Sequence, residues 1–151
     1  MSTISDTAKQ HLENLVAFFG INAAASVSEN DDGIELDIES SPSAPRLIGH
    51  HGETLRALEY LVNQMIRHEF SESPRINVDV AGYKLARRHA LEEQAREIAA
   101  RVTESGAEEA FPPMNPAERR IVHMVLRDIE TVQTESRGED RARHIVVLPA
   151  E

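Results

Sequence analysis

The chain has 151 residues and a formal net charge of −10, and it contains no cysteine. The lack of cysteine excludes disulfides, thiol catalysis and thiolate zinc sites. No apolar run approaches the roughly 18 residues of a membrane span, and the N-terminus lacks the basic and apolar regions of a signal peptide. We therefore expect a cytoplasmic protein without membrane insertion.

The negative charge is distributed unevenly. Residues 1–80 hold 5 Lys and Arg against 13 Asp and Glu, a balance of −8, and residues 81–151 hold 11 against 13, a balance of −2. Because contacts to phosphate need cations, an overall acidic chain is a poor candidate for nucleic-acid binding unless its arginines are clustered. The second half therefore needs a local reading.

The first half combines helical and strand periodicity, which predicts an α+β layer with helices on one face of a small sheet. Period-two alternation on both sides of Asn30-Asp31-Asp32-Gly33 predicts a β-hairpin with one buried face. The expected elements are a helix over about 4–19, strands over 21–27 and 34–38, a helical turn over 46–48, a helix from Glu53 to before Ser73-Pro74, and a strand over 76–80.

The helix that begins near Glu53 is amphipathic. We expect its buried face to consist of Leu55, Leu58, Leu61, Val62, Met65 and Ile66. We expect its solvated face to consist of Arg56, Glu59, Asn63 and Arg67.

Directly before this helix stands Gly49-His50-His51-Gly52. Glycine takes positive φ without steric cost, so the two glycines let the backbone turn sharply and approach another polymer closely. The start of the next helix adds free amides and the positive end of the helix dipole. A G-x-x-G match is weak by itself, but this combination predicts a site for a phosphate backbone.

The second half opens with a long helix from Tyr83 to about Ser105, whose expected buried side comprises Leu85, Leu91, Ala95, Ile98, Ala99 and Val102. An extended segment over 111–114 leads to Asn115, an expected N-cap followed by proline at the first helical position. Strands over 131–136 and 143–148 are expected to close the domain, with a turn at 137–140.

The helix after Asn115 separates into two faces at 100° per residue. The apolar face holds Ile121, Val122, Val125, Leu126 and Ile129. The opposite face holds Arg119, Arg120, His123 and Arg127. An exposed helix face often carries charge without a function, but no carboxylate falls within this basic arc, so we favour an anion-binding surface. Arg137, Arg141 and Arg143 could extend it.

The element order of the first half, with Gly49-His50-His51-Gly52 between its two central helices, resembles a KH domain of the type II arrangement over residues 1–81. The resemblance implies that Gly49, His50, His51 and Gly52 clamp the backbone of about four nucleotides. It also implies that Leu47, Ile48 and Leu55 help to form an apolar groove for the bases.

The sequence Arg119-x-x-x-His123, within Pro113 to His123, resembles the helix that gives the Arg-xxx-His domain its name, a small α/β binder of single-stranded nucleic acid, here over residues 82–151. A KH domain followed by this domain is similar to the Jag family, also called SpoIIIJ-associated proteins. The resemblance implies a bacterial, cytoplasmic regulator that binds single-stranded RNA or DNA, sometimes with a small partner KH protein. We expect a short form without the extra N-terminal domain of many members.

Other functions are less well supported by the sequence. The seven histidines show no ligand pair such as His-x-x-x-His, and His50 and His51 are expected to point apart, so we predict no metal site and no cofactor. No serine elbow or P-loop is present, which argues against an enzyme. The alternative is a protein-interaction adaptor whose KH half has lost RNA binding, because the family usually has a basic residue where His50 and His51 stand.

Overall fold

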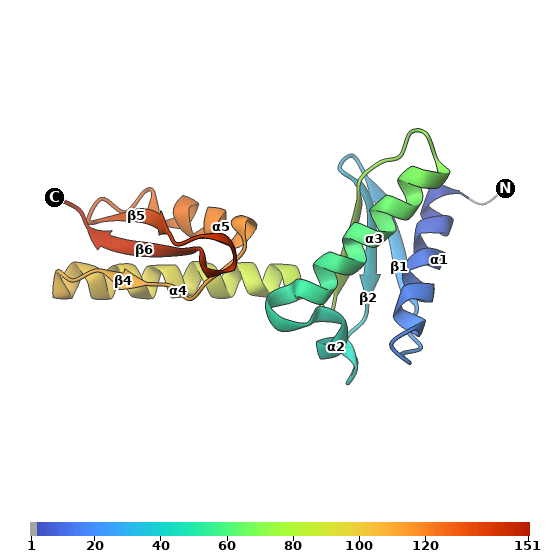
Figure 1. Cartoon of the computed structure of the whole chain (residues 1–151), viewed down its shortest axis with the longest axis horizontal. Helices are drawn as coiled ribbons and strands as arrows, with labels where there is room; N and C mark the ends of the chain where they lie inside the picture. Colours follow the sequence, from blue (N-terminus) through green and yellow to red (C-terminus); the bar gives the residue numbers. More distant parts are fainter. Residues whose placement is uncertain (1–2) are drawn as a thin grey trace. The chain divides into compact units, whose positions relative to one another are not determined.

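The computed structural model describes residues 3–151 and divides the chain into two compact units, Met1–Lys84 and Leu85–Glu151 (Figure 1). Each unit is α+β with its own three-stranded sheet. The elements of the first unit are α1 (Ile4–Ala17), β1 (Ala25–Asn30), β2 (Gly33–Ile38), α2 (Ala44–Ile48), the 3₁₀ turn η1 (His50–Gly52), α3 (Glu53–Glu69) and β3 (Ile76–Val80).

The order of elements predicted for the first unit is confirmed. The sheet has the order β1-β2-β3, with β1 antiparallel to β2 and β2 parallel to β3. Parallel neighbours need a long crossover. Helices α2 and α3, with the glycine turn between them, provide it, so the sheet topology itself places the glycine turn between two helices.

Helices α1 and α3 lie side by side on one face of this sheet (Figure 1). They share a core with the inward side chains of the strands, and the most deeply buried members are Leu12, Val16, Leu36, Leu47, Leu55, Val62, Ile66, Ile76 and Val78. The other side of the strands carries carboxylates. There, burial raises the pKa of Asp37, and the neighbouring carboxylates of Asp79 and Glu35 raise it further.

The buried face predicted for α3 needs one correction. Leu61 remains 43% exposed, because the helix turns only one side toward the sheet. The face predicted to be solvated is also wrong at two positions. Asn63 exchanges hydrogen bonds with the backbone of Ile76 (2.7 and 3.1 Å), and Glu59 accepts from the amide of Val78 at 2.9 Å. These two side chains occupy backbone groups on the outer edge of β3.

The hairpin also begins later than its alternation suggested. Residues 21–24 are not in a strand, β1 starts at Ala25, and Val27 is exposed. Ile21 is nevertheless buried in the core. Apolar alternation reported burial correctly at Ile21 but did not show where strand pairing starts, because strand pairing depends on the partner's register.

The second unit contains most of α4 (Tyr83–Ser105), then β4 (Glu109–Ala110), α5 (Pro116–Leu126), β5 (Val132–Arg137), the 3₁₀ turn η2 (Asp140–Ala142) and β6 (His144–Pro149). Its sheet is antiparallel with the order β4-β6-β5. The two-residue strand β4 was not predicted, since it is too short to show periodicity.

Helices α4 and α5 share one core with this sheet, built from Leu91, Ala95, Ile98, Val102, Val122, Leu126, Ile145 and Val147 among others. Leu85, predicted to be buried, is 61% exposed. The predicted N-cap is confirmed, because the Asn115 side chain accepts from the Glu118 amide at 3.0 Å. Glu118 is itself buried and accepts from Nε of Arg87 at 2.8 Å, which ties α5 to α4.

Candidate nucleic-acid interface

The glycine turn has a left-handed backbone at three positions. The φ angles are 73° at Gly49, 52° at His51 and 76° at Gly52. A Cβ on Gly49 would overlap the side chain of Thr54, and one on Gly52 would lie 2.8 Å from a ring carbon of Tyr83. Contacts within the unit thus already require both glycines, whether or not a ligand approaches.

Three amides of the turn are not free, contrary to the prediction. The amide of Gly49 donates to the carbonyl of Pro45 at 2.9 Å, and that of Gly52 donates to the carbonyl of Gly49 at 3.4 Å. The amide of Glu53 donates to the carbonyl of His50. Gly52 is also buried. A ligand that meets this turn therefore meets mainly its side chains.

Two of the three residues predicted to form an apolar groove do not reach the surface. Leu47 is 0% exposed and Leu55 is 1% exposed, so both belong to the core beneath the turn. Ile48 is half-buried and packs against the same core. The physical reason is that a short helix such as α2 must bury its apolar side chains against α3, which leaves none of them for bases.

His50 and His51 are both exposed and form the outer surface of the turn. Their rings stack with centroids 4.0 Å apart and planes 20° from parallel, so the expectation that they point apart is wrong. The left-handed backbone at His51 brings its ring back over that of His50. The carbonyl of His51 accepts from Nη1 of Arg56 at 2.9 Å, which holds an arginine of α3 beside the pair.

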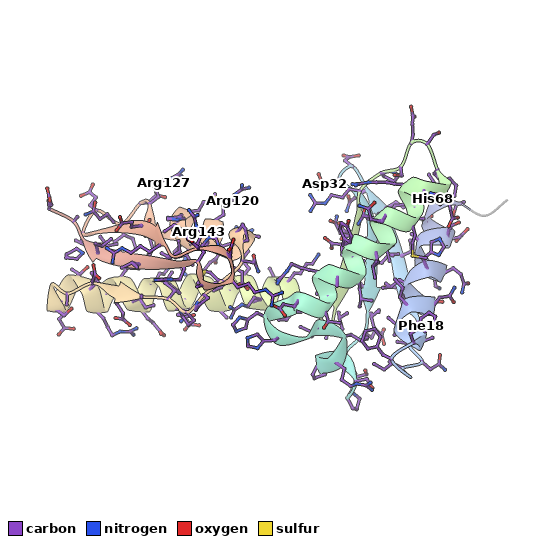
Figure 2. The ribbon with its side chains drawn as sticks, viewed as in Figure 1. Phe18, Asp32, His68, Arg120, Arg127 and Arg143 are labelled. Carbon is purple, nitrogen blue, oxygen red and sulfur yellow. The ribbon has the colours of Figure 1, made fainter. Side chains whose placement is uncertain are left out.

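In the second unit, the basic side chains of α5 differ in how free they are. Arg120 and Arg127 are exposed and project toward the same side of the unit (Figure 2). Within the described part of the chain, Arg120 has no ion pair. Arg127 lies 3.6 Å from the carboxylate of Asp128, an exposed pair that costs a ligand little to displace. The prediction that no carboxylate approaches this face is thus wrong at Arg127.

Arg119 and His123 are one helical turn apart, and each is bound within the unit. Nη1 of Arg119 donates to the carbonyl of Met114 at 2.7 Å, and Nδ1 of His123 lies 2.6 Å from Oγ1 of Thr134 on β5. Burial lowers the pKa of His123, and the positive charge of Arg119 lowers it further. His123 is therefore a neutral hydrogen-bonding group at pH 7 rather than a cation.

The arginines after α5 contribute less than expected. The Arg137 guanidinium pairs with Glu108 at 3.0 Å and with Glu135 at 2.8 Å, so its charge is compensated and it does not extend the basic surface. Arg143 donates to Oγ of Ser136 at 3.0 Å and is exposed on the same unit (Figure 2). Arg141 is exposed on η2.

An open groove runs between α5 and β5, and we call it the α5 groove. It is lined by His123, Met124 and Arg127 from the helix and by Gln133 and Thr134 from the strand. Sequence reasoning missed the exposed Met124 and both strand residues. Gln133 and Thr134 stand beside His123 only because β5 packs against α5, and no sequence spacing reports that pairing.

No metal site is found among residues 3–151, where no cluster of three His, Asp or Glu side chains has suitable geometry. Over the same range, no helix combines the length and the apolar character needed to cross a bilayer.

Comparison with known families matches residues 89–149 to the Arg-xxx-His domain, and Arg119 and His123 lie within this match. Nearly the whole chain is also similar to proteins named RNA-binding protein KhpB. It is 32% identical over 146 residues to the Clostridium symbiosum protein, 28% over 142 residues to that of Bacillus subtilis (strain 168), and 28% over 137 residues to that of Streptococcus pneumoniae serotype 2.

These alignments cover 96%, 93% and 91% of this chain, and 66%, 68% and 42% of the respective relatives. The chain thus spans between about two fifths and two thirds of their length. The geometry of α5 and these alignments agree on the second unit. The chain carries an Arg-xxx-His domain and is related along almost its whole length to the KhpB family, also known as Jag, of RNA-binding proteins.

Proposed function

We propose that this chain binds single-stranded RNA without catalysis and acts as a post-transcriptional regulator. In this proposal residues 1–81 are a KH domain of the type II arrangement, and residues 82–151 are the Arg-xxx-His domain. The observed order of helices and strands in the first unit, with the glycine turn between α2 and α3, supports the first assignment.

The observation that carries the proposal is the exposed face of α5. Arg120 and Arg127 offer two guanidinium groups to a phosphate backbone, and the α5 groove beside them offers apolar and hydrogen-bonding groups to a base. Arg119 and His123 support this face from within, since each is held by a hydrogen bond to the unit itself.

In the first unit, His50 and His51 are the groups that a strand would meet at the glycine turn. Their stacked rings offer a flat surface and hydrogen-bonding nitrogens, and Arg56 adds a guanidinium beside them. Leu47 and Leu55 have no direct part, because they are buried. Two modest sites on one chain raise each other's effective concentration, so their combined affinity exceeds either alone.

The first test replaces the free arginines of α5. Arg120→Ala with Arg127→Ala should weaken binding of a 12-nucleotide single-stranded RNA roughly tenfold, from about 0.7 kcal/mol for each exposed charge contact. The salt slope, log Kd against log salt concentration, should fall by about 0.7 for each phosphate that the variant no longer contacts. Fluorescence anisotropy measures both quantities.

A matched control is Arg88→Ala with Arg101→Ala, which removes the same charge from the same unit at two arginines that already pair with Glu92 and Glu109. The control should bind like the unmodified chain. If both double variants lose affinity equally, net charge alone explains binding, and α5 is not the contact surface. Competition with single-stranded DNA of the same sequence shows whether the site distinguishes the two.

A second candidate function is a protein-interaction adaptor whose first unit does not contact RNA. The buried Gly52 and the occupied amides of the glycine turn favour it. The discriminating experiment replaces both His50 and His51 with Asp. An RNA-binding turn should then repel the strand, whereas the adaptor should bind RNA through its second unit with unchanged affinity.

A further inference from the structure

The cations of the first unit are gathered on one side of α3. Its six Lys and Arg residues are Lys9, Arg46, Arg56, Arg67, Arg75 and Lys84. Three of them have roles inside the unit: Lys9 pairs with Glu13, Arg46 donates to the carbonyl of Phe19, and Lys84 pairs with Glu59. The other three, Arg56, Arg67 and Arg75, all line one open groove.

This α3 groove lies between the outer face of α3 and the segment that leads into β3. Its surface is formed by Arg56, Tyr60, Gln64 and Arg67 from the helix and by Pro74 and Arg75 from the segment. The helical rise of about 1.5 Å per residue places Arg56 and Arg67 roughly 16 Å apart along the axis. The groove is thus long enough for more than one nucleotide.

The charges in the groove are available to an anion. Arg67 and Arg75 are exposed, and within residues 3–151 neither pairs with a carboxylate. Glu59 also lines the groove, but its carboxylate already accepts from the amide of Val78 and from Lys84. In a unit this acidic, an uncompensated pair of guanidinium groups on one surface favours a polyanion as the ligand.

An aromatic ring stands between the two ends of the groove. Tyr60 is 63% exposed and lies one helical turn beyond Arg56. Grooves that combine cations with an exposed aromatic ring are typical of proteins that hold single-stranded nucleic acid, because every base can stack on the ring. The bond between Arg56 and the carbonyl of His51 joins this groove to the glycine turn.

We propose that the α3 groove is a second contact surface of the first unit, which takes the RNA strand where it leaves the glycine turn. Arg67 and Arg75 bind backbone phosphates, and Tyr60 stacks on a base. This inference rests on the RNA binding proposed above and extends it. It also explains how a unit with a net negative charge and no lysine or arginine between its glycines gains affinity for RNA.

The test measures binding of a fluorescein-labelled 12-nucleotide single-stranded RNA to the full chain. Arg67→Ala with Arg75→Ala should weaken binding at least about fivefold and reduce the salt slope by about 1.4, or 0.7 for each phosphate contact. Tyr60→Ala should weaken binding about fivefold or more because a base can no longer stack there, with the salt slope unchanged. Tyr60→Phe keeps the ring and should bind like the unmodified chain.

The matched control is Lys9→Ala with Arg88→Ala, which removes the same net charge at two positions already paired on their own helices. Circular dichroism should show that all variants are folded, since none of the replaced side chains lies in either core. Failure of the unmodified chain to bind RNA would overturn the proposed function together with this inference. RNA binding that is lost with Arg120 and Arg127 but unaffected by the α3 variants would overturn the inference alone and assign the groove to a protein partner.

Discussion

At the scale of single residues, internal packing decides which groups face a ligand. Gly49 and Gly52 look like residues chosen for the close approach of a polymer, yet Thr54 and Tyr83 already fill the space that a Cβ would need. His50 and His51 are the residues of the turn that remain exposed. Likewise Arg119 and His123 carry the motif of α5, but Arg120 and Arg127 carry its free charge.

Gly52→Ala should destabilise the chain by more than the strain of a left-handed backbone. That strain costs about 1–2 kcal/mol for a residue with a Cβ, and the clash with Tyr83 should add roughly 1–3 kcal/mol. Gly20→Ala is the matched control, because Gly20 has a φ of 72° and no atom within 4 Å of its added Cβ. Urea unfolding should therefore rank Gly52→Ala well below Gly20→Ala, and equal losses would show that Tyr83 does not press on the turn.

His123 should make the fold sensitive to acid. Its pKa is lowered in the folded chain, by burial first and by Arg119 second, so folding favours the neutral ring. The resulting stability is complete above the unfolded-state pKa of about 6.5 and is lost as pH falls toward the lower folded-state pKa. His123→Gln should flatten the fall in unfolding free energy between about pH 7 and 5. An unchanged profile would mean that His123 is not buried as described.

At the scale of elements, α3 has two jobs on its two outer faces. Asn63 and Glu59 close the outer edge of β3 by bonding its backbone, which protects an edge strand from pairing with another chain. Arg56, Tyr60 and Arg67 stand on the adjoining stripe and line the α3 groove. A helix that looks simply amphipathic in sequence therefore holds the sheet edge and presents the cations of the unit.

Asn63→Ala should destabilise the first unit by about 1–3 kcal/mol, because the amide and carbonyl of Ile76 would both lose their side-chain partner at a half-buried edge. The neighbouring exposed Gln64→Ala should change the unfolding free energy by less than about 0.5 kcal/mol. Thermal unfolding of both variants checks this. Similar values for the two would contradict a structural role for Asn63.

At the scale of the whole molecule, an acidic chain is expected to hold a polyanion through a few uncompensated arginines. Several of its other arginines are paired with carboxylates, as at Arg87, Arg101 and Arg137. Each unit retains its own small group of free guanidinium side chains, one lining the α3 groove and one on α5. Because a single chain carries both groups, their modest affinities combine on a strand that reaches both.

RNA length should report this combination. A strand long enough to reach both units should bind at least about tenfold more tightly than a strand of about 6 nucleotides, through the effective concentration of the second site. Arg120→Ala with Arg127→Ala should bring the affinity for the long strand close to that for the short one, whereas the control at Arg88 and Arg101 should not. Equal affinities for both lengths in the unmodified chain would show that one unit binds alone.

The sequence by itself determined the order of the elements, the fold class, the N-cap at Asn115 and the basic face of α5, because periodicity, capping and charge are local properties. Tertiary structure decided everything that depends on a neighbour distant in sequence. It buried Leu47 and Leu55, paired Arg137 with Glu108, set Thr134 against His123 and placed Arg75 in one groove with Arg67. Burial and charge compensation are set by partners from other elements, and no spacing along a helix encodes them.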